Sequence, residues 1–413
     1  MITQFTVQGI ELKDVHSVDV LEDGSSKIYF VTIKSKPCKC MYCQSKDTSI
    51  KEYVHKTIRL LDEGILNCYM EMTIPRFKCN TCKKTFAYKL NSTIQDKYSN
   101  EFIRKIKQDF ESMISFKDIA KRFHMDLMTV CRLFDTVVEN RRQMLGEAIC
   151  IDEFKSFGDE TKYSSVLLDF ETHKIIDVIE SRTLPYLRQY FRKQPQNLLK
   201  KVKLFSCDMY DGYITIAKEF FPNALICIDP FHYMKYFTAA IQDIRIRLCK
   251  CYGPRPENSG RLNSNREDLT KDALHEDKKY VDETTGVIYD RFDIVNEKIK
   301  NIPELSKAYN MLQDFYFESK LKANRNPVSA KNLIELTINK MYDSGIQELI
   351  DCADTRDHYK DYIINSFTYY KGKRISNGPI EGVNSRIKTL KKIMSGFRNL
   401  KRFINRLIYI INK

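Results

Sequence analysis

The alternation of apolar and polar residues separates a strand-rich beginning from a short helical segment. Residues 27–34 and 68–74 have the composition and patterning of strands. Residues 98–142 carry apolar positions at helical spacing together with many basic residues. We therefore expect a strand-rich module followed by short, basic helices.

Residues 147–233 alternate between strand-like and helix-like segments. Three strand-like runs come first, and strand-helix alternation follows. This order predicts a mixed sheet with helices on its faces. The expected strands are residues 148–154, 163–170, 174–181, 201–208 and 224–229, and the expected helices are residues 184–194 and 213–221.

Residues 245–370 lose nearly all strand signals and take on helical periodicity with high charge, which is typical of a helical insertion. A strong amphipathic helix follows from residue 379, and another from about residue 399. On a helical wheel the buried stripe of the first of these helices is Ile380, Val383, Ile387, Leu390 and Met394.

Two C-x-x-C turns lie in the strand-rich beginning. Cys40 and Cys43 form the first, and Cys79 and Cys82 form the second after 35 intervening residues. Each turn offers two thiolates, and two such turns brought together by strands supply the four tetrahedral sulfurs of one structural Zn²⁺ site. The aromatic residues expected to cover this site are Phe77, Phe86 and Tyr88.

Other interpretations of the cysteines stay open. They could be free thiols or redox pairs, although a redox C-x-x-C usually occurs once, near a strand-to-helix junction. Cys38 is an alternative zinc ligand, and Cys68 is a spare thiol. The total of thirteen cysteines is odd, and the first residues lack the apolar stretch of an export signal, so a disulfide framework is disfavoured.

Residues 115–138 predict two short helices with a break at Met125 and Asp126. Two such helices with a tight connection match a helix-turn-helix. Thr129 and Arg132 would lie on the exposed face of the second helix, where contacts with DNA occur. An ordinary helical hairpin is the alternative, and the basic flanking residues favour the DNA-binding form.

Two aspartates stand where strands are expected to end. Asp152 and Asp208 each follow an apolar run, and carboxylates at the ends of neighbouring strands can converge on one point. Two Mg²⁺ ions about 4 Å apart need such convergent oxygens for phosphoryl transfer. Each aspartate taken alone is equally well explained as a turn residue or a helix cap.

The third carboxylate is expected on the amphipathic helix that starts near Pro379. Glu381, Asn384 and Lys388 share one face of that helix, a layout suited to binding metal and phosphate together. Residues 371–413 hold twelve Lys or Arg and a single acid, Glu381, for a net charge of +11. The alternative for Glu381 is a first-turn acid that favours the helix dipole.

Further acids and a histidine compete for places in the site. Glu153 and Asp211 lie beside the two aspartates, and Asp229 and His232 follow another expected strand. His232 would contact phosphate or activate water, although a lone histidine is more often a structural hydrogen-bonding group. We keep Asp229, His232, Asn384 and Lys388 as auxiliary residues.

The charge of the whole chain supports a polyanionic partner. The formal net charge is +14, and the basic excess is concentrated after residue 370. The DNA contacts expected there come from Arg386, Lys388, Lys391 and Lys392. No apolar run approaches the roughly 18 residues that a membrane span needs, so we expect a cytoplasmic, nucleoid-associated protein without a membrane partner.

The chain resembles bacterial insertion-sequence transposases of the DDE class, in the branch called the ISL3 family. The resemblance covers nearly the whole chain, and its most specific part runs from Asn377 to Phe403. The motifs that carry it are Ile151-Asp152-Glu153-Phe154, Asp208-Met209-Tyr210, Asp229-Pro230-Phe231-His232, Asn377-Gly378-Pro379-Ile380-Glu381-Gly382-Val383-Asn384-Ser385-Arg386-Ile387-Lys388, and Gly396-Phe397-Arg398-Asn399 with Arg402-Phe403. Pro230 departs from the basic or polar residue expected at its position.

The resemblance implies a mixed α+β and α/β architecture with an RNase H-like catalytic core. Asp152, Asp208 and Glu381 would bind two Mg²⁺ ions, and the N-terminal modules would bind the terminal inverted repeats of the element. We also expect a homo-oligomer when the protein assembles on DNA. The implied parts are a zinc ribbon at 1–95, a helix-turn-helix at 96–145, the first part of the core at 146–244, a helical insertion at 245–370, and the C-terminal core helices with the catalytic glutamate at 371–413.

The implied activity is cleavage at the element ends and joining of the freed 3′-hydroxyl to target DNA. One alternative is a DNA-binding regulator that has the zinc ribbon and the helix-turn-helix but an inactive core. A metal-dependent nuclease without strand transfer is a second alternative. Three convergent acids would have no use in a regulator, which favours the transposase.

Overall fold

The computed structural model describes residues 4–34, 37–87, 94–95, 97–156, 162–252, 266–272, 280–281, 286–321, 326–376, 378–394 and 399–413. The chain forms two compact units. Unit 1 comprises Met1–Arg141 and Lys388–Lys413, and unit 2 comprises Arg142–Ile387.

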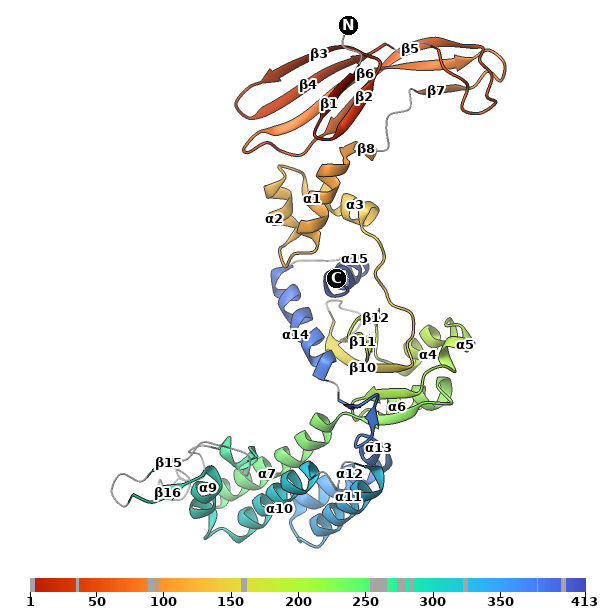
Figure 1. Cartoon of the computed structure of the whole chain (residues 1–413). Coiled ribbons are helices and arrows are strands. Elements are labelled where there is room, and N and C mark those ends of the chain that lie inside the picture. The colour runs from red at the N-terminus through yellow and green to blue at the C-terminus, as the bar shows by residue number, and fades with distance from the viewer. Residues whose placement is uncertain are drawn as a thin grey trace. The chain divides into compact units, whose positions relative to one another are not determined.

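Unit 1 begins with a large sheet. Its strand order is β3-β4-β6-β5-β9-β8, with β7 paired to β6, and β1 and β2 form a separate hairpin (Figure 1). Buried aliphatic residues such as Val31, Met70 and Ile74 form the core beneath it. The strands of unit 1 are β1 (Gln4–Val7), β2 (Ile10–Lys13), β3 (Val15–Glu22), β4 (Ser26–Ile33), β5 (Thr48–Arg59), β6 (Asn67–Cys79), β7 (Thr85–Ala87), β8 (Ile94–Gln95) and β9 (Tyr98–Ser99).

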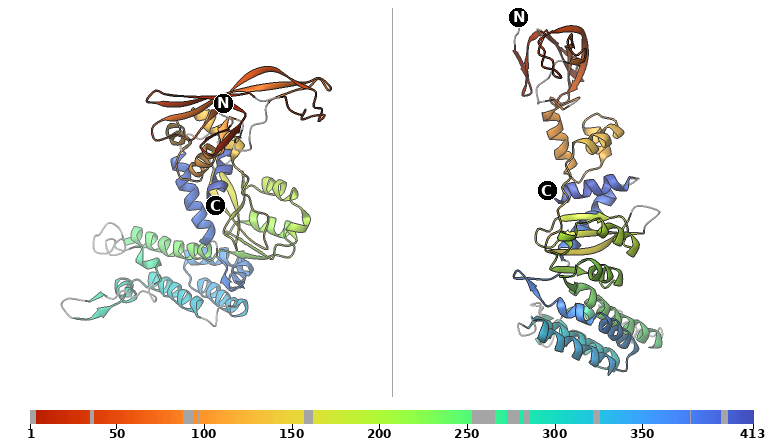
Figure 2. Two further views of the ribbon diagram at one scale, coloured as in Figure 1. Left: turned by 45° about the horizontal axis from the view of Figure 1, so that its top comes forward. Right: turned by 90° about the vertical axis from the view of Figure 1, so that its right-hand side faces the viewer.

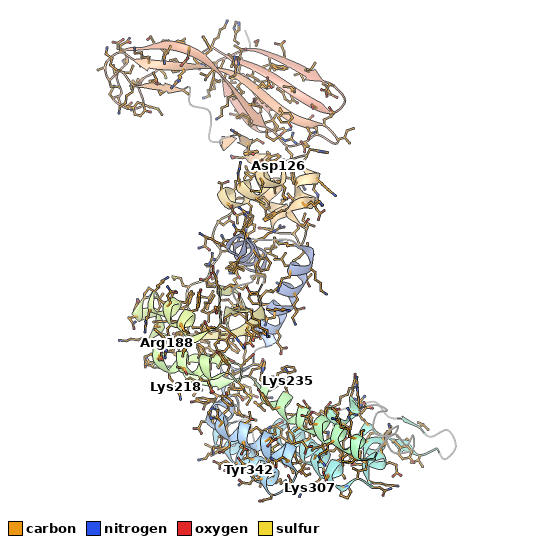
Figure 3. All side chains as sticks on the ribbon, turned by 180° about the vertical axis from the view of Figure 1, so that it is seen from behind. Asp126, Arg188, Lys218, Lys235, Lys307 and Tyr342 are labelled. Atoms are coloured by element: carbon orange, nitrogen blue, oxygen red, sulfur yellow. The ribbon has the colours of Figure 1, made fainter. Side chains whose placement is uncertain are left out.

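Helices complete the described part of unit 1. They are α1 (Asn100–Phe110), α2 (Phe116–Arg122), α3 (Leu127–Val137) and α15 (Leu400–Ile411), together with the end of α14 (Gly378–Ile393) from Lys388 on. The turn between α2 and α3 passes through His124, whose φ of 49° lies in the left-handed region. Asp126, labelled in Figure 3, then caps α3 by accepting hydrogen bonds from the backbone N–H groups of Met128 and Thr129.

Unit 2 is built on a five-stranded mixed sheet. Its strand order is β12-β11-β10-β13-β14 (Figure 1). The pairs β12-β11 and β11-β10 are antiparallel, whereas β10-β13 and β13-β14 are parallel. The strands are β10 (Ala148–Lys155), β11 (Tyr163–Asp169), β12 (Ile175–Ile179), β13 (Leu204–Cys207) and β14 (Leu225–Ile228).

Helices pack against this sheet. α4 contacts β12 and α6 contacts β13, and α4 and α6 contact each other. Arg188 of α4, labelled in Figure 3, binds the Glu219 carboxylate at the end of α6. These helices are α4 (Leu184–Arg192), α5 (Gln196–Leu199), α6 (Asp211–Phe220) and the long α7 (Pro230–Tyr252).

A helical layer follows α7 and shares one continuous core with the sheet. Figure 2 shows α10 and α12 lying along α7, in agreement with their contacts. The elements are η1 (Asp268–Thr270), β15 (Tyr280–Val281), β16 (Ile288–Tyr289), α9 (Arg291–Ile299), α10 (Pro303–Lys320), α11 (Pro327–Tyr342), α12 (Gln347–His358), α13 (Lys360–Asn365), β17 (Tyr369–Tyr370), β18 (Lys373–Arg374) and α14 (Gly378–Ile393).

The structure confirms a mixed α and β fold with an N-terminal sheet. It also confirms the buried stripe of α14, since Ile380, Val383, Ile387, Leu390 and Met394 are all buried. The finer division into five parts stays a prediction; α7 runs through the expected boundary at 244/245, and the boundary between the units falls within α14. Among the described residues, no helix combines the length and apolar character needed to cross a membrane.

Candidate active site and metal centres

Strand register explains why Asp152 and Asp208 meet. β10 and β13 are parallel, and Cys150 on β10 pairs with Ser206 on β13. Two residues further along, Asp152 lies within β10 and Asp208 directly follows β13, so the two side chains stand close together on neighbouring strands. Asp208 therefore stands at the end of its strand as expected, whereas the expectation for Asp152 is wrong, because β10 continues to Lys155. Both are nearly buried, with 9% of Asp152 and 7% of Asp208 exposed.

Glu153 joins these two aspartates. Carboxylate oxygens of Asp152, Glu153 and Asp208 all lie within 4.8 Å of one another, a grouping that could hold a metal ion. Glu153 Oε1 binds Arg182 Nη1 at 2.7 Å, whereas Oε2 is buried and has no hydrogen-bond partner among the described residues. A hard oxygen left without a partner beside two other carboxylates fits a cation ligand.

The electrostatics of this group favour a bound cation. Burial, and then the charge and hydrogen bond of Asp208, raise the pKa of Asp152 to about 9. Two carboxylates this close in a buried setting cannot both ionise at low cost unless positive charge lies beside them. A divalent cation would supply that charge.

The parallel neighbour β14 brings Asp229 and His232 to the same edge of the sheet. Asp229 is 2% exposed, and its Oδ2 accepts a hydrogen bond from the backbone N–H of Phe231 at the start of α7. His232 Nε2 lies 3.0 Å from Asp208 Oδ1. Burial lowers the pKa of His232, but the hydrogen bond and charge of Asp208 outweigh it, so the pKa is raised overall.

Helix α14 reaches the carboxylates through Asn384. Asn384 Nδ2 donates a hydrogen bond of 2.6 Å to Asp152 Oδ2, and Asn384 Oδ1 is buried without a partner among the described residues. Glu381, one turn earlier on α14, is exposed and lies outside the group of three acids. Lys388, one turn later, is also exposed. A metal-binding role for Glu381 therefore stays a prediction.

Arg182 is a site residue that sequence reasoning missed. Besides binding Glu153, its guanidinium carbon lies 4.5 Å from the ring centre of Tyr163 and 5.0 Å from that of Tyr210. This packing fixes the position of the guanidinium beside the acid group. Nothing in the sequence marks it beyond its place just after an expected strand.

The four cysteines of the C-x-x-C turns come together in unit 1. The Sγ atoms of Cys40 and Cys82 are 3.6 Å apart, as are those of Cys43 and Cys79, and all four lie within 4.8 Å of one another. A tetrahedral site with Zn–S bonds of about 2.3 Å places its sulfurs about 3.8 Å apart. The residues therefore fit one Zn²⁺ ion.

The surroundings of the four sulfurs also suit a metal. Phe77 and Phe86 pack against them as expected, whereas Tyr88 lies outside the described residues. Cys38 is exposed and is not part of the group, and Cys68 is buried in the core of the large sheet.

Their thiols do not titrate alike. The backbone N–H of Cys82 is the main cause that lowers the pKa of Cys79 to about 6. The backbone of Ser45 lowers the pKa of Cys43, but loss of solvation and the neighbouring thiols raise it more, to about 12. Thiols this close ionise together only if a cation balances their charge.

The two helices expected within residues 115–138 are α2 and α3, and their role as a DNA-binding helix-turn-helix stays a prediction. On α3, Arg132 is exposed and Thr129 is partly exposed. On α14, Arg386, Lys388 and Lys392 are exposed and Lys391 is partly exposed. Asn377 and residues 396–398, which belong to the family motif, lie outside the described residues.

The comparison with protein families identifies the class of protein. The model of the ISL3-type DDE family, described as "Transposase", matches residues 149–407, which is more than half of the chain. The match spans every strand-end acid of unit 2, Glu381 and most of α15. The chain belongs to the ISL3 family of DDE transposases.

A curated protein gives a second, shorter match. A protein named "ATP-dependent protease" from Lactococcus lactis subsp. lactis is 34% identical over 111 residues, which cover 27% of this chain. The chain spans about a third of that relative's length, since the match covers 32% of it.

Proposed function

We propose that this protein is the transposase of an insertion sequence, which binds the terminal inverted repeats, cleaves DNA at the element ends and joins the 3′-hydroxyl to target DNA. The observation that carries the proposal is the pairing of Asp152 and Asp208 on neighbouring parallel strands, within a chain of the ISL3 family. Family membership supports transposition, and the carboxylate pair supports metal-dependent cleavage and joining of DNA.

The proposed core fold is RNase H-like. Three antiparallel strands followed by two parallel ones, in the order β12-β11-β10-β13-β14, support this assignment. The central strand β10 then carries the first acid of the site, Asp152, and its neighbour β13 leads directly into the second, Asp208. The helices α9 to α13 would be an insertion between the second acid and the third.

The proposed metal ligands are Asp152, Asp208 and Glu381, for two Mg²⁺ ions. When bound, such ions would activate the attacking oxygen and stabilise the leaving oxygen. The donors already gathered at the site are all oxygens, which suit Mg²⁺. We keep Glu381 as the proposed third metal ligand because it lies one turn from Asn384 on α14, and no described residue forms an ion pair with it.

The chain's own residues would orient the reacting groups. Asn384 would fix the rotamer of Asp152 through its 2.6 Å hydrogen bond. His232 would orient Asp208 and hold a proton beside it. In cleavage, a water oxygen bonds to phosphorus while the 3′-oxygen leaves and takes up a proton. In joining, that 3′-hydroxyl loses its proton, attacks a target phosphodiester and releases the target's own 3′-oxygen.

DNA recognition is assigned to α2 and α3, with Thr129 and Arg132 facing the bases or phosphates. Arg386, Lys388, Lys391 and Lys392 of α14 would bind phosphates. The cysteine group would hold one structural Zn²⁺ that stabilises the end of the β5-β6 ribbon. Assembly of two element ends would require more than one copy of the chain, so we propose a homo-oligomer on DNA.

A DNA-binding regulator with an inactive core is the second candidate. The observation that favours it is the position of Glu381 outside the group of acids. Strand cleavage distinguishes the two functions, because only the transposase cuts DNA.

The deciding experiment measures Mg²⁺-dependent cleavage of a duplex carrying the native element end. Wild-type protein and a Glu335→Gln control, altered at an acid of α11 in the insertion, should cut equally well. Asp208→Asn and Glu381→Gln should lose cleavage to below detection but still bind the duplex in a gel shift, because removing a negative charge does not weaken attraction to phosphate. Near-wild-type cleavage by Asp208→Asn would refute the proposed chemistry.

A further inference from the structure

Helix α15 follows the whole of unit 2 in the sequence, yet it belongs to unit 1 together with α1, α2 and α3. Eight of its twelve residues are buried. We propose that α15 is an integral part of the DNA-end recognition module and fixes the recognition helix α3, so that only a chain containing α15 can discriminate element ends. The proposal rests on the end-binding role assigned above to α2 and α3.

The ion pair between Arg402 and Asp135 ties α15 to α3. Arg402 Nε lies 2.9 Å and 3.0 Å from the two carboxylate oxygens of Asp135, and Nη2 lies 2.6 Å from Oδ2. Such a two-pronged arginine–carboxylate contact fixes orientation as well as distance. Asp135 lies about one turn from Arg132, so the contact holds the part of α3 that would face DNA.

Arg406 ties α15 to the turn between α1 and α2. Its side chain is fully buried, and Nη2 donates to the carbonyl oxygens of Ser112 at 3.3 Å and Ile114 at 2.7 Å. Its guanidinium carbon also lies 4.3 Å from the ring centre of Phe116, the first residue of α2. Burial lowers the pKa of Arg406 to about 10, which leaves it cationic at neutral pH.

This arginine does more than fill space. An apolar side chain would occupy the position without the cost of desolvating a cation. The carbonyls that Arg406 binds belong to the chain leading into α2, so its charge sets where α2 begins relative to α1.

A third set of contacts surrounds Tyr409. Its ring centre lies 3.9 Å from the guanidinium carbon of Arg141 and 6.4 Å from the ring of Phe134 on α3. Arg141 in turn binds Glu111 at the end of α1 at 2.6 Å. Contacts of α15 therefore reach α1, α3 and the start of α2.

The geometry of Arg402 argues against a simple phosphate contact. Only 17% of its side chain is exposed, and both its Nε and Nη2 atoms are engaged by Asp135. Its proposed role is to position α3. Because α15 is synthesised after the entire core, a chain that stops before residue 400 lacks the helix that completes the recognition module.

Charge reversal in the full-length protein separates positioning from simple attraction. Asp135→Arg adds positive charge, which by attraction alone would tighten binding to any DNA. If α15 positions α3, the same change should weaken binding to a duplex of the native terminal repeat by about 5- to 150-fold, the range expected for losing a base-reading contact. The double variant Asp135→Arg with Arg402→Asp restores an opposite-charge pair and should recover most of the affinity.

Affinities should be measured on the terminal-repeat duplex and on a scrambled duplex of equal length, well below the melting temperature of every variant. Asp243→Arg is the matched control, because Asp243 is an exposed aspartate of α7 in unit 2 and lies outside the N-terminal modules assigned to end binding. It should bind both duplexes at least as well as wild type. Wild-type or tighter terminal-repeat binding by Asp135→Arg would overturn the proposal.

Amide hydrogen exchange distinguishes failure of this inference from failure of the proposed function. In Asp135→Arg the amides of α3 should exchange faster than in wild type and Asp243→Arg, and the double variant should restore their protection. Unchanged α3 exchange overturns the role of α15 whatever the DNA result. If wild type shows no preference for the terminal repeat, the end-binding function fails, while the exchange data still test the contact between α15 and α3.

Discussion

Replacing Asp152 by Asn should stabilise the protein in the absence of Mg²⁺ while removing its ability to bind that ion. In the folded protein Asp152 is buried beside Asp208, and its pKa is raised from 3.8 to about 9. In the unfolded chain the same carboxyl ionises freely above pH 3.8. Folding at neutral pH must therefore keep a proton on this group or leave two close carboxylates charged. An asparagine avoids this cost and can still donate a hydrogen bond to Asp208.

The size of the effect follows from the pKa shift. From pH 3.8 to pH 7 is about three pH units, and each unit of mismatch costs about 1.4 kcal/mol, which gives an upper value of about 4 kcal/mol. Relaxation of the site and water entry reduce this figure, so we expect about 1–4 kcal/mol. The loss of folding free energy in the wild type begins near pH 3.8 and grows until about pH 9, because over that interval Asp152 loses its proton only in the unfolded state.

The assay is thermal unfolding without Mg²⁺ and with added Mg²⁺. Strong chelators must be left out, because they would also remove zinc. Without Mg²⁺, Asp152→Asn should melt several degrees above wild type, since about 1 kcal/mol shifts the midpoint by about 2–4 °C in a domain of this size. The gap should be larger at about pH 8 than at about pH 5. Mg²⁺ should raise the midpoint of wild type but not that of Asp152→Asn.

Asp243→Asn is the matched control, because Asp243 is an exposed aspartate on α7 in the same unit. It should melt like wild type and keep the response to Mg²⁺. A lower midpoint for Asp152→Asn without Mg²⁺ would show that burying Asp152 beside Asp208 does not destabilise the metal-free protein. An undiminished response of that variant to Mg²⁺ would show that Asp152 is not needed to bind the ion.

Two further predictions concern the metal centres. Cys79→Ser should reduce bound zinc, measured by elemental analysis, from about one ion per chain to near zero. Cys38→Ser should retain the zinc, because Cys38 lies outside the four-sulfur group. Equal zinc in both variants would contradict the assignment. Asn384→Asp should lower the Mg²⁺-free melting temperature, because it places a carboxylate where Asn384 Nδ2 now lies 2.6 Å from Asp152, and Mg²⁺ should recover part of the loss. An unchanged midpoint would mean that Asn384 does not contact Asp152 in solution.

The sequence by itself determined the features that depend on local period and spacing. Apolar runs predicted strands at Asp152 and Asp208, and parallel pairing of β10 with β13 places the two acids together, although Asp152 lies within β10 and only Asp208 follows the end of its strand. The 3.6-residue period predicted the buried stripe of α14, and the C-x-x-C spacing predicted the group of four sulfurs. These predictions from period and spacing are possible because each depends on the geometry of one element or of one pair of turns.

Only the tertiary structure decided which side chains meet across distant elements. The helical wheel put Glu381 and Asn384 on one face of α14 but could not say which of them would contact Asp152, because a wheel carries no information about how far a helix slides or turns against its neighbour. In the structure, Asn384 is the residue that contacts Asp152.

The same reason explains Arg182 and α15. The contact of Arg182 with Glu153 joins the segment after β12 to β10, and the contact of Arg402 with Asp135 joins residues 267 positions apart. Amphipathic periodicity showed that α15 had a face to bury but not which helices would bury it. Partner choice depends on the packing of the folded chain, since side chains meet through the path of the backbone in space and not through their spacing in sequence.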